Sequence, residues 1–166
     1  MTYTILDRIA SAETSSDLSH KPHNCDADVL GAVGMAAIQN PAHLAVYRVK
    51  YLNDMADILP AKRVFILWAR KAMVNRKINT DGASRLGTQL LFGWIYDTCQ
   101  ACKGLKYPII EGTPTLSIKP CQACNGTGKT PIKAQSAEVL EVCFDVIERA
   151  DAVILTIQRM IKEKLR

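Results

Sequence analysis

Four cysteines form two identical Cys-Gln-Ala-Cys motifs, and their spacing predicts a metal site. Cys99 and Cys102 make the first pair, and Cys121 and Cys124 make the second, with residues 103–120 between them. Two residues between paired thiols let one tight turn present both sulfurs to the same ion, and the loop is long enough for the pairs to face each other. The pattern is typical of a four-thiolate zinc site. Because four thiolates leave no position open for water or substrate, we expect structural zinc and no enzymatic activity.

Glycines after each pair agree with this interpretation. Gly104 follows Cys102 by two residues, and Gly126 and Gly128 follow Cys124. Glycine readily adopts the positive φ angles that a metal-binding turn requires. A redox Cys-X-X-Cys motif would be expected near a βαβ pattern, and a disulfide framework in an oxidising compartment. The sequence indicates neither, so zinc is the cofactor we expect.

Composition predicts a folded protein of a reducing, cytoplasmic compartment. The chain has 166 residues, of which 48% are hydrophobic, enough for one domain with a core. No apolar run approaches the roughly 18 residues that span a bilayer, and the N-terminus lacks the basic start and apolar run of a secretion signal. We therefore expect no membrane partner. The net charge of +5 permits an acidic partner such as nucleic acid without proving one.

Apolar periodicity predicts a mainly α protein in which a four-cysteine zinc finger or ribbon is inserted into a helical domain. We expect a flexible arm over residues 1–25, a helical domain over 26–98, the finger over 99–130 and a long C-terminal helix within 131–166. The helices expected in the helical domain are Asp26–Gln39, Pro41–Ala56, Ala61–Ile78 and Ala83–Thr98.

Individual stripes within these segments make the prediction specific. In the helix from Pro41 the core stripe is Leu44, Tyr47, Tyr51 and Met55, which step by three and four residues. In the finger, two β-prone runs at 107–110 and 115–118 flank a Gly-Thr-Pro turn, so we expect a hairpin or an irregular ribbon.

The last helix carries an uninterrupted apolar seam from about Ser136 to Leu165. Its members are Leu140, Cys143, Ile147, Ala150, Ile154, Ile157 and Ile161. Packing on the chain's own helices is the interpretation we favour, with Cys143 as a small hydrophobe. The alternative is that two copies of the chain form a homodimer in which their last helices pack together along this seam.

Basic residues gather in two places that could contact nucleic acid. One is the stretch 62–85, where a helix, a short break and a second helix resemble the outline of a helix-turn-helix; the other surrounds the cysteines. The candidate phosphate contacts are Arg70, Arg76, Lys77, Arg85, Lys103, Lys106, Lys119 and Lys129. An ordinary solvated helix face explains the first group as well. Lysines that merely offset thiolate charge explain the second.

A second metal site is conceivable at His20, His23 and Cys25, followed by Asp26. A polar linker accounts for the same residues, and we favour the linker.

Two features together resemble the late-gene antitermination protein Q family of lambda-like phages. One is the pair of C-x-x-C-x-G knuckles entered from a helix. The other is the segment 28–36, Asp-Val-Leu-Gly-Ala-Val-Gly-Met-Ala, which is similar to a D-V-x-x-x-x-G-M-A segment of that family. The similarity extends from about Asp26 through Gly128. The knuckles alone also resemble the cysteine-rich region of DnaJ-type chaperones.

The resemblance implies a mostly helical protein with one zinc on Cys99, Cys102, Cys121 and Cys124. It also implies DNA binding near a late promoter and loading onto a paused host RNA polymerase, which then reads through terminators. Lys106 stands where a second glycine would complete the first knuckle, and one long helical run replaces the helix-turn-helix expected after the second knuckle. The alternatives are a DnaJ-type protein-binding module and another zinc-dependent DNA-binding regulator.

Overall fold

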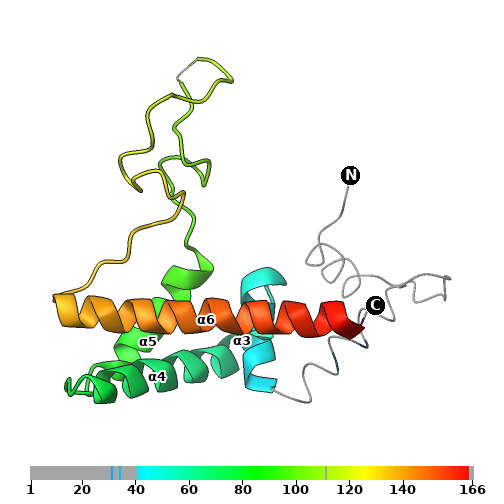
Figure 1. Ribbon diagram of the computed structural model, residues 1–166, viewed down its shortest axis with the longest axis vertical. Helices are drawn as coiled ribbons and strands as arrows, with labels where there is room; N and C mark the ends of the chain where they lie inside the picture. The colour runs from blue at the N-terminus through cyan, green and yellow to red at the C-terminus, as the bar shows by residue number, and fades with distance from the viewer. Residues whose placement is uncertain (1–30, 32–33, 35–40, 111, 165–166) are drawn as a thin grey trace.

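The computed structural model describes residues 31, 34, 41–110 and 112–164, and this part of the chain is mainly helical. The helices are α3 (Pro41–Tyr51), α4 (Ile58–Asn75), α5 (Ala83–Ile95) and α6 (Ala137–Lys164), with a short 3-10 helix, η1 (Met55–Asp57), before α4. Figure 1 shows α6 lying across the other helices, while residues 99–130, the finger, project away from them. A mainly helical protein with a four-cysteine cluster and a long C-terminal helix was predicted, and this fold class is confirmed.

The core lies where one apolar face of each helix meets the others. Tyr47 of α3, Phe65 of α4, Leu91 of α5 and Val146 of α6 are fully buried there. The aromatic rings of Phe65 and Trp94 pack in a tilted geometry with centroids 5.6 Å apart. Such offset aromatic pairs add to the free energy gained from buried apolar area. The four helices therefore share one hydrophobic core.

The helix from Pro41 is shorter than predicted, and its expected stripe is wrong at two positions. The chain leaves α3 at Tyr51, because Asn53 adopts a left-handed φ of 53° and the Asp54 side chain accepts a hydrogen bond from the Ala56 N–H. Tyr51 and Met55, expected in the core, are 39% and 46% exposed. The next helix consequently begins at Ile58 rather than Ala61.

Helix α4 ends in a Schellman motif centred on Lys77. The Ile78 N–H donates to the Met73 carbonyl, the Lys77 N–H donates to the Val74 carbonyl, and Lys77 has a φ of 57°. Ile78 also packs on the cluster that contains Met73. The helix therefore stops at Asn75 instead of Ile78.

Helices α4 and α5 pack side by side in opposite directions. Met73 near the end of α4 lies with Ala83 at the start of α5, whereas Phe65 contacts Trp94 near the end of α5. Residues 76–82 join the two helices, a longer link than the three- or four-residue turn of a helix-turn-helix. The arrangement is an antiparallel helical hairpin.

Helix α6 closes the core. Ser136 accepts a hydrogen bond from the Val139 N–H at 3.2 Å, as an N-cap residue does, and the helix then runs through Lys164. Its buried residues include most of the predicted seam and three neighbouring valines. They are Val142, Cys143, Val146, Ala150, Val153, Ile154, Ile157 and Ile161. The seam that a homodimer would use is thus covered by the chain's own helices.

Within the described residues, no helix combines the length and the apolar character needed to cross a bilayer. The arm over 1–25 and the possible site at His20, His23 and Cys25 lie outside the described residues. Of the helix expected over Asp26–Gln39, the structure describes Gly31 and Gly34, and both are helical.

Candidate metal centre

The four cysteines of the two knuckles come together in one buried cluster. All four Sγ atoms lie within 4.8 Å of one another, and each cysteine is at most 4% exposed. The Sγ atoms of Cys102 and Cys124 are 3.7 Å apart, well beyond the length of a disulfide bond. A tetrahedral ion with metal–sulfur bonds of about 2.3 Å would space its sulfurs about 3.8 Å apart. The cluster therefore fits a single metal ion.

The two knuckles hold each other through a reciprocal pair of hydrogen bonds. The Cys99 N–H donates to the Gly128 carbonyl, and the Cys121 N–H donates to the Lys106 carbonyl, both at 2.9 Å. Each knuckle thus accepts the hydrogen bond that the first cysteine N–H of the other knuckle donates. The cysteine pairs are fixed face to face by backbone contacts as well as by any shared ion.

Each knuckle reverses direction through the same series of left-handed residues. After Cys102 these are Lys103, Gly104 and Lys106, with φ of 49°, 82° and 68°. After Cys124 the corresponding residues are Asn125, Gly126 and Gly128, with φ of 50°, 74° and 78°. The glycines predicted to allow positive φ therefore do so, and Lys106 takes the glycine-like conformation despite its side chain.

The thiols differ in acidity because their surroundings differ. Burial, together with hydrogen bonding to the neighbouring thiols, raises the pKa of Cys102 to about 11. Burial also works to raise the pKa of Cys124, but the Gly128 N–H, 3.3 Å from its sulfur, and the other thiols lower it to about 6. Cys124 is therefore the first of these two to become a thiolate, the form that binds metal.

A short neck joins the finger to the helices. Thr98 and Lys129 form an antiparallel bridge, and the Thr130 N–H donates to the Asp97 carbonyl. The sequence predicted that this helix would extend to Thr98. The backbone pairing explains why α5 instead ends at Ile95. The finger is thus held at its base by backbone pairing.

Asp97 ties this neck to α3. Its carboxylate lies 3.1 Å from Lys50 Nζ and 3.1 Å from Lys129 Nζ. The hydrogen bond to Asp97 raises the pKa of Lys129. Lys50 also donates to the Trp94 carbonyl and lies 4.6 Å from the centroid of the Trp94 ring. Asp97 had no predicted role, because its partners are far away in the sequence.

The far end of the finger is the predicted ribbon. Ile109 and Leu116 form an isolated antiparallel bridge, flanked by hydrogen bonds from Ile110 N–H to the Thr115 carbonyl and from Ser117 N–H to the Pro108 carbonyl. The pairing extends over too few residues to form a regular strand.

The residues predicted to contact nucleic acid differ in their surroundings. All of them except Arg76 are exposed to solvent: Arg70, Lys77, Arg85, Lys103, Lys106, Lys119 and Lys129. Arg76 forms ion pairs with Glu141 and Asp145 of α6, and Lys129 is paired with Asp97. Arg76 and Lys129 therefore have structural partners within the chain.

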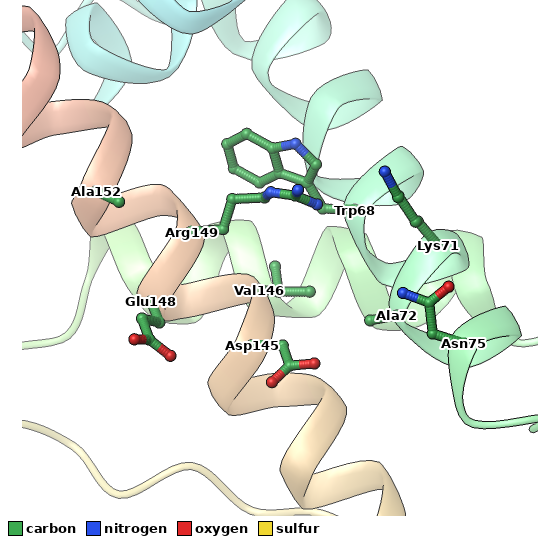
Figure 2. Close-up of a pocket in the computed structure, with 9 residues that line it drawn as sticks. All are labelled: Trp68, Lys71, Ala72, Asn75, Asp145, Val146, Glu148, Arg149 and Ala152. Atoms are coloured by element: carbon green, nitrogen blue, oxygen red, sulfur yellow. The ribbon is translucent and has the colours of Figure 1, made fainter.

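Arg70 and Lys71 of the basic stretch 62–85 lie near Trp68 together with Arg149, for which the sequence gave no signal. Figure 2 shows Lys71 of α4 and Arg149 of α6 beside Trp68 in a groove of about 410 Å³ between the two helices. The carboxylates of Asp145 and Glu148 line the same groove. A second groove of about 560 Å³ is lined by His43, Trp68, Arg70, Lys71 and Arg149, with Leu67 and Val74. Arg149 was missed because only the packing of α6 on α4 brings it there.

Fold and site together define a mainly helical protein with a buried four-cysteine site that could hold a metal ion. The chain matches no protein-family model, no curated protein and no solved structure.

Proposed function

We propose that the chain binds zinc at the four cysteines and acts as a phage transcription antitermination factor that binds DNA and host RNA polymerase. The zinc assignment is supported by the all-sulfur donor set and by the close spacing of its four sulfurs, since soft thiolates favour zinc over hard cations. Zinc here is structural: the ion would hold Cys99, Cys102, Cys121 and Cys124 together and leave no open position.

DNA binding is supported by the cations around Trp68. Arg70, Lys71 and Arg149 line the groove of about 560 Å³ with this aromatic ring, and none of the described residues that line it is a carboxylate. Cations that contact phosphates beside an aromatic ring that stacks on bases are a recurring arrangement in nucleic-acid-binding proteins. This is the single observation that carries the nucleic-acid proposal. The resemblance of the knuckles to the antitermination family supplies its particular form.

DNA binding is tested by a salt titration with a labelled duplex. Each phosphate contact contributes about 0.9 to the slope of log affinity against log salt. Replacing both Arg70 and Arg149 with glutamate should weaken binding and lower that slope by about 2. Lys162→Glu, an exposed charge change near the end of α6, is the matched control. An unchanged slope in the double variant would exclude the Trp68 grooves from DNA contact.

Antitermination is tested by single-round transcription with purified host polymerase. The template carries the phage's late promoter and a downstream terminator. The zinc-loaded protein should increase the fraction of transcripts that pass the terminator, and Cys121→Ser should not. No increase with the wild-type protein would reject the antitermination role, even if DNA binding persisted.

A further inference from the structure

The ribbon, residues 107–118, exposes several large apolar side chains. Paired residues of an antiparallel bridge share one face, so Ile109 and Leu116 lie on the same face. Tyr107 precedes Ile109 by two residues and Ile118 follows Leu116 by two, and both are exposed. The hydrogen bonds that flank the bridge pair Pro108 with Ser117 and Ile110 with Thr115, so the opposite face carries two hydroxyl residues as well as Ile110. The bridged pair and the two flanking residues form an exposed apolar surface, and we call Tyr107, Ile109, Leu116 and Ile118 the apolar ribbon face.

The helices leave this face uncovered. Ile109 is 53% exposed and Ile118 is 96% exposed, and Tyr107 and Leu116 are also exposed. Figure 1 shows the hairpin at the end of the finger farthest from the helices. Contiguous exposed apolar side chains on a projecting element are typical of a protein interaction site.

The backbone N–H groups of Ile109 and Leu116, at the outer edges of the ribbon, also lack a hydrogen-bond partner within the described part of the chain. The hydrogen bonds that flank the Ile109–Leu116 bridge direct the N–H and C=O groups of these two residues away from the partner strand. Among the described residues, neither amide donates a hydrogen bond to another part of the chain. An extended segment could therefore pair with either edge and lay its side chains along both faces.

The positive charges beside the ribbon indicate what kind of extended segment it would bind. Lys106 precedes the ribbon, Lys119 follows it, and both are exposed. Across residues 99–130 the sequence has a single acidic residue, Glu111, against four lysines. A second copy of the ribbon would bring like charges together, whereas acidic side chains would meet complementary ones.

We propose that the apolar ribbon face docks an extended segment of a partner protein in which apolar and acidic residues alternate. The apolar residues of this segment pack on Ile109, Leu116 and Ile118, and its acidic residues reach Lys106 and Lys119. Backbone pairing at the ribbon edge fixes the register. This inference goes beyond the proposed function, because it depends on neither DNA binding nor antitermination.

The experiment measures binding of labelled eight-residue peptides to the zinc-loaded full chain by fluorescence anisotropy. Three peptides serve as probes: alternating valine and glutamate, alternating valine and lysine, and four valines followed by four glutamates. We expect saturable binding of the alternating acidic peptide, and binding at least tenfold weaker for the other two. The double variant Leu116→Ser/Ile118→Ser should lose at least tenfold in affinity. Leu155→Ser, which removes an exposed leucine of α6, should bind as the wild type does.

Zinc content and helical circular dichroism establish that each variant is folded. Three results would overturn the proposal: no saturable binding of the alternating acidic peptide, equal binding of the lysine peptide, or unchanged affinity in the folded double variant. Sedimentation of the protein alone provides a further check. A dimer that the double variant abolishes would assign the apolar ribbon face to a second copy and reject the acidic partner.

Discussion

Lys106 and Gly128 occupy equivalent positions in the two knuckles. Each lies four residues after the second cysteine of its pair, each has a left-handed φ, 68° and 78°, and each offers its carbonyl to the first cysteine amide of the other knuckle. The backbone symmetry is kept although only one of the two residues is glycine. Residue 106 accommodates a lysine side chain, whereas a Cβ at residue 128 would clash with the Gly104 carbonyl. Replacing Lys106 with glycine and Gly128 with alanine should therefore have different effects.

Gly128→Ala should weaken the metal site strongly. A Cβ at residue 128 would lie 2.7 Å from the Gly104 carbonyl oxygen, and the φ of 78° disfavours any side chain. Left-handed strain alone costs about 1–3 kcal/mol. Lys106→Gly, the matched change, should retain full metal content, since glycine accepts the same φ. Competition with a chromophoric chelator measures both affinities. Equal affinities for the two variants would contradict the proposed asymmetry.

Removing the metal should unfold the finger and spare the helices. The four helices have their own core around Phe65, Leu91 and Val146. The cysteines form a separate cluster with few other buried side chains. Cys121→Ser or a strong chelator should therefore leave most of the helical circular dichroism and abolish amide protection at Cys99 and Gly104. Hydrogen exchange checks this residue by residue. Full metal content in Cys121→Ser would refute the ligand set.

The cysteine cluster was predictable because its determinants are local. Two residues between paired thiols and glycines at fixed offsets define each knuckle, and these appear directly in the sequence. The seam of α6 was predictable for the same reason: Cys143, Ile154 and Ile161 follow helical periodicity and are all buried.

What could not be predicted depends on contacts between distant residues or on competing local signals. The predicted burial of Tyr51 and Met55 was wrong because Asn53 and Asp54, residues that favour a turn, interrupt the helix between them. The ion pairs of Arg76 with Glu141 and Asp145 of α6 were not anticipated when Arg76 was predicted to contact phosphate. Nothing in the spacing of these residues indicates that α6 returns along α4.

Asp97→Asn should loosen the neck of the finger. The carboxylate contacts both Lys50 and Lys129, and the Lys50 side chain is only 13% exposed, so its charge would lose its main partner. Such a loss typically costs about 1–3 kcal/mol. We expect lower stability to urea and faster amide exchange at Lys129 and Thr130. A double-mutant cycle with Lys50→Met isolates the pair; additive effects would show that the Asp97–Lys50 contact contributes nothing.

Stability should fall below about pH 6.5 through His43. Burial, and then the positive charge of Arg149, lower the pKa of His43 from its usual value of 6.5. As pH falls through 6.5 the unfolded chain takes up a proton before the folded chain does, so the free energy of unfolding decreases. His43→Gln should show a smaller decrease between pH 7.5 and 5.5 in urea unfolding. Cysteine protonation affects both proteins alike and cancels in the comparison. Parallel pH profiles would remove His43 as the cause.

Gly87 allows α4 and α5 to approach closely, and replacing it should separate them. A Cβ at residue 87 would lie 2.6 Å from Ile66 Cα and 2.7 Å from Ile66 N, which are backbone atoms that cannot move aside cheaply. Overpacking of this kind costs about 1–3 kcal/mol, and we expect Gly87→Ala to lower the unfolding midpoint accordingly.

Gly93 of the same helix is the matched control. Nothing lies within 4 Å of a Cβ built there, so Gly93→Ala gains helix propensity without a clash and should raise stability by up to about 1 kcal/mol. Urea unfolding of both variants measures the difference. Because the two substitutions are chemically identical, opposite signs can come only from the packing of α5 on α4. A stabilising Gly87→Ala would mean that the helices are not in contact at Ile66.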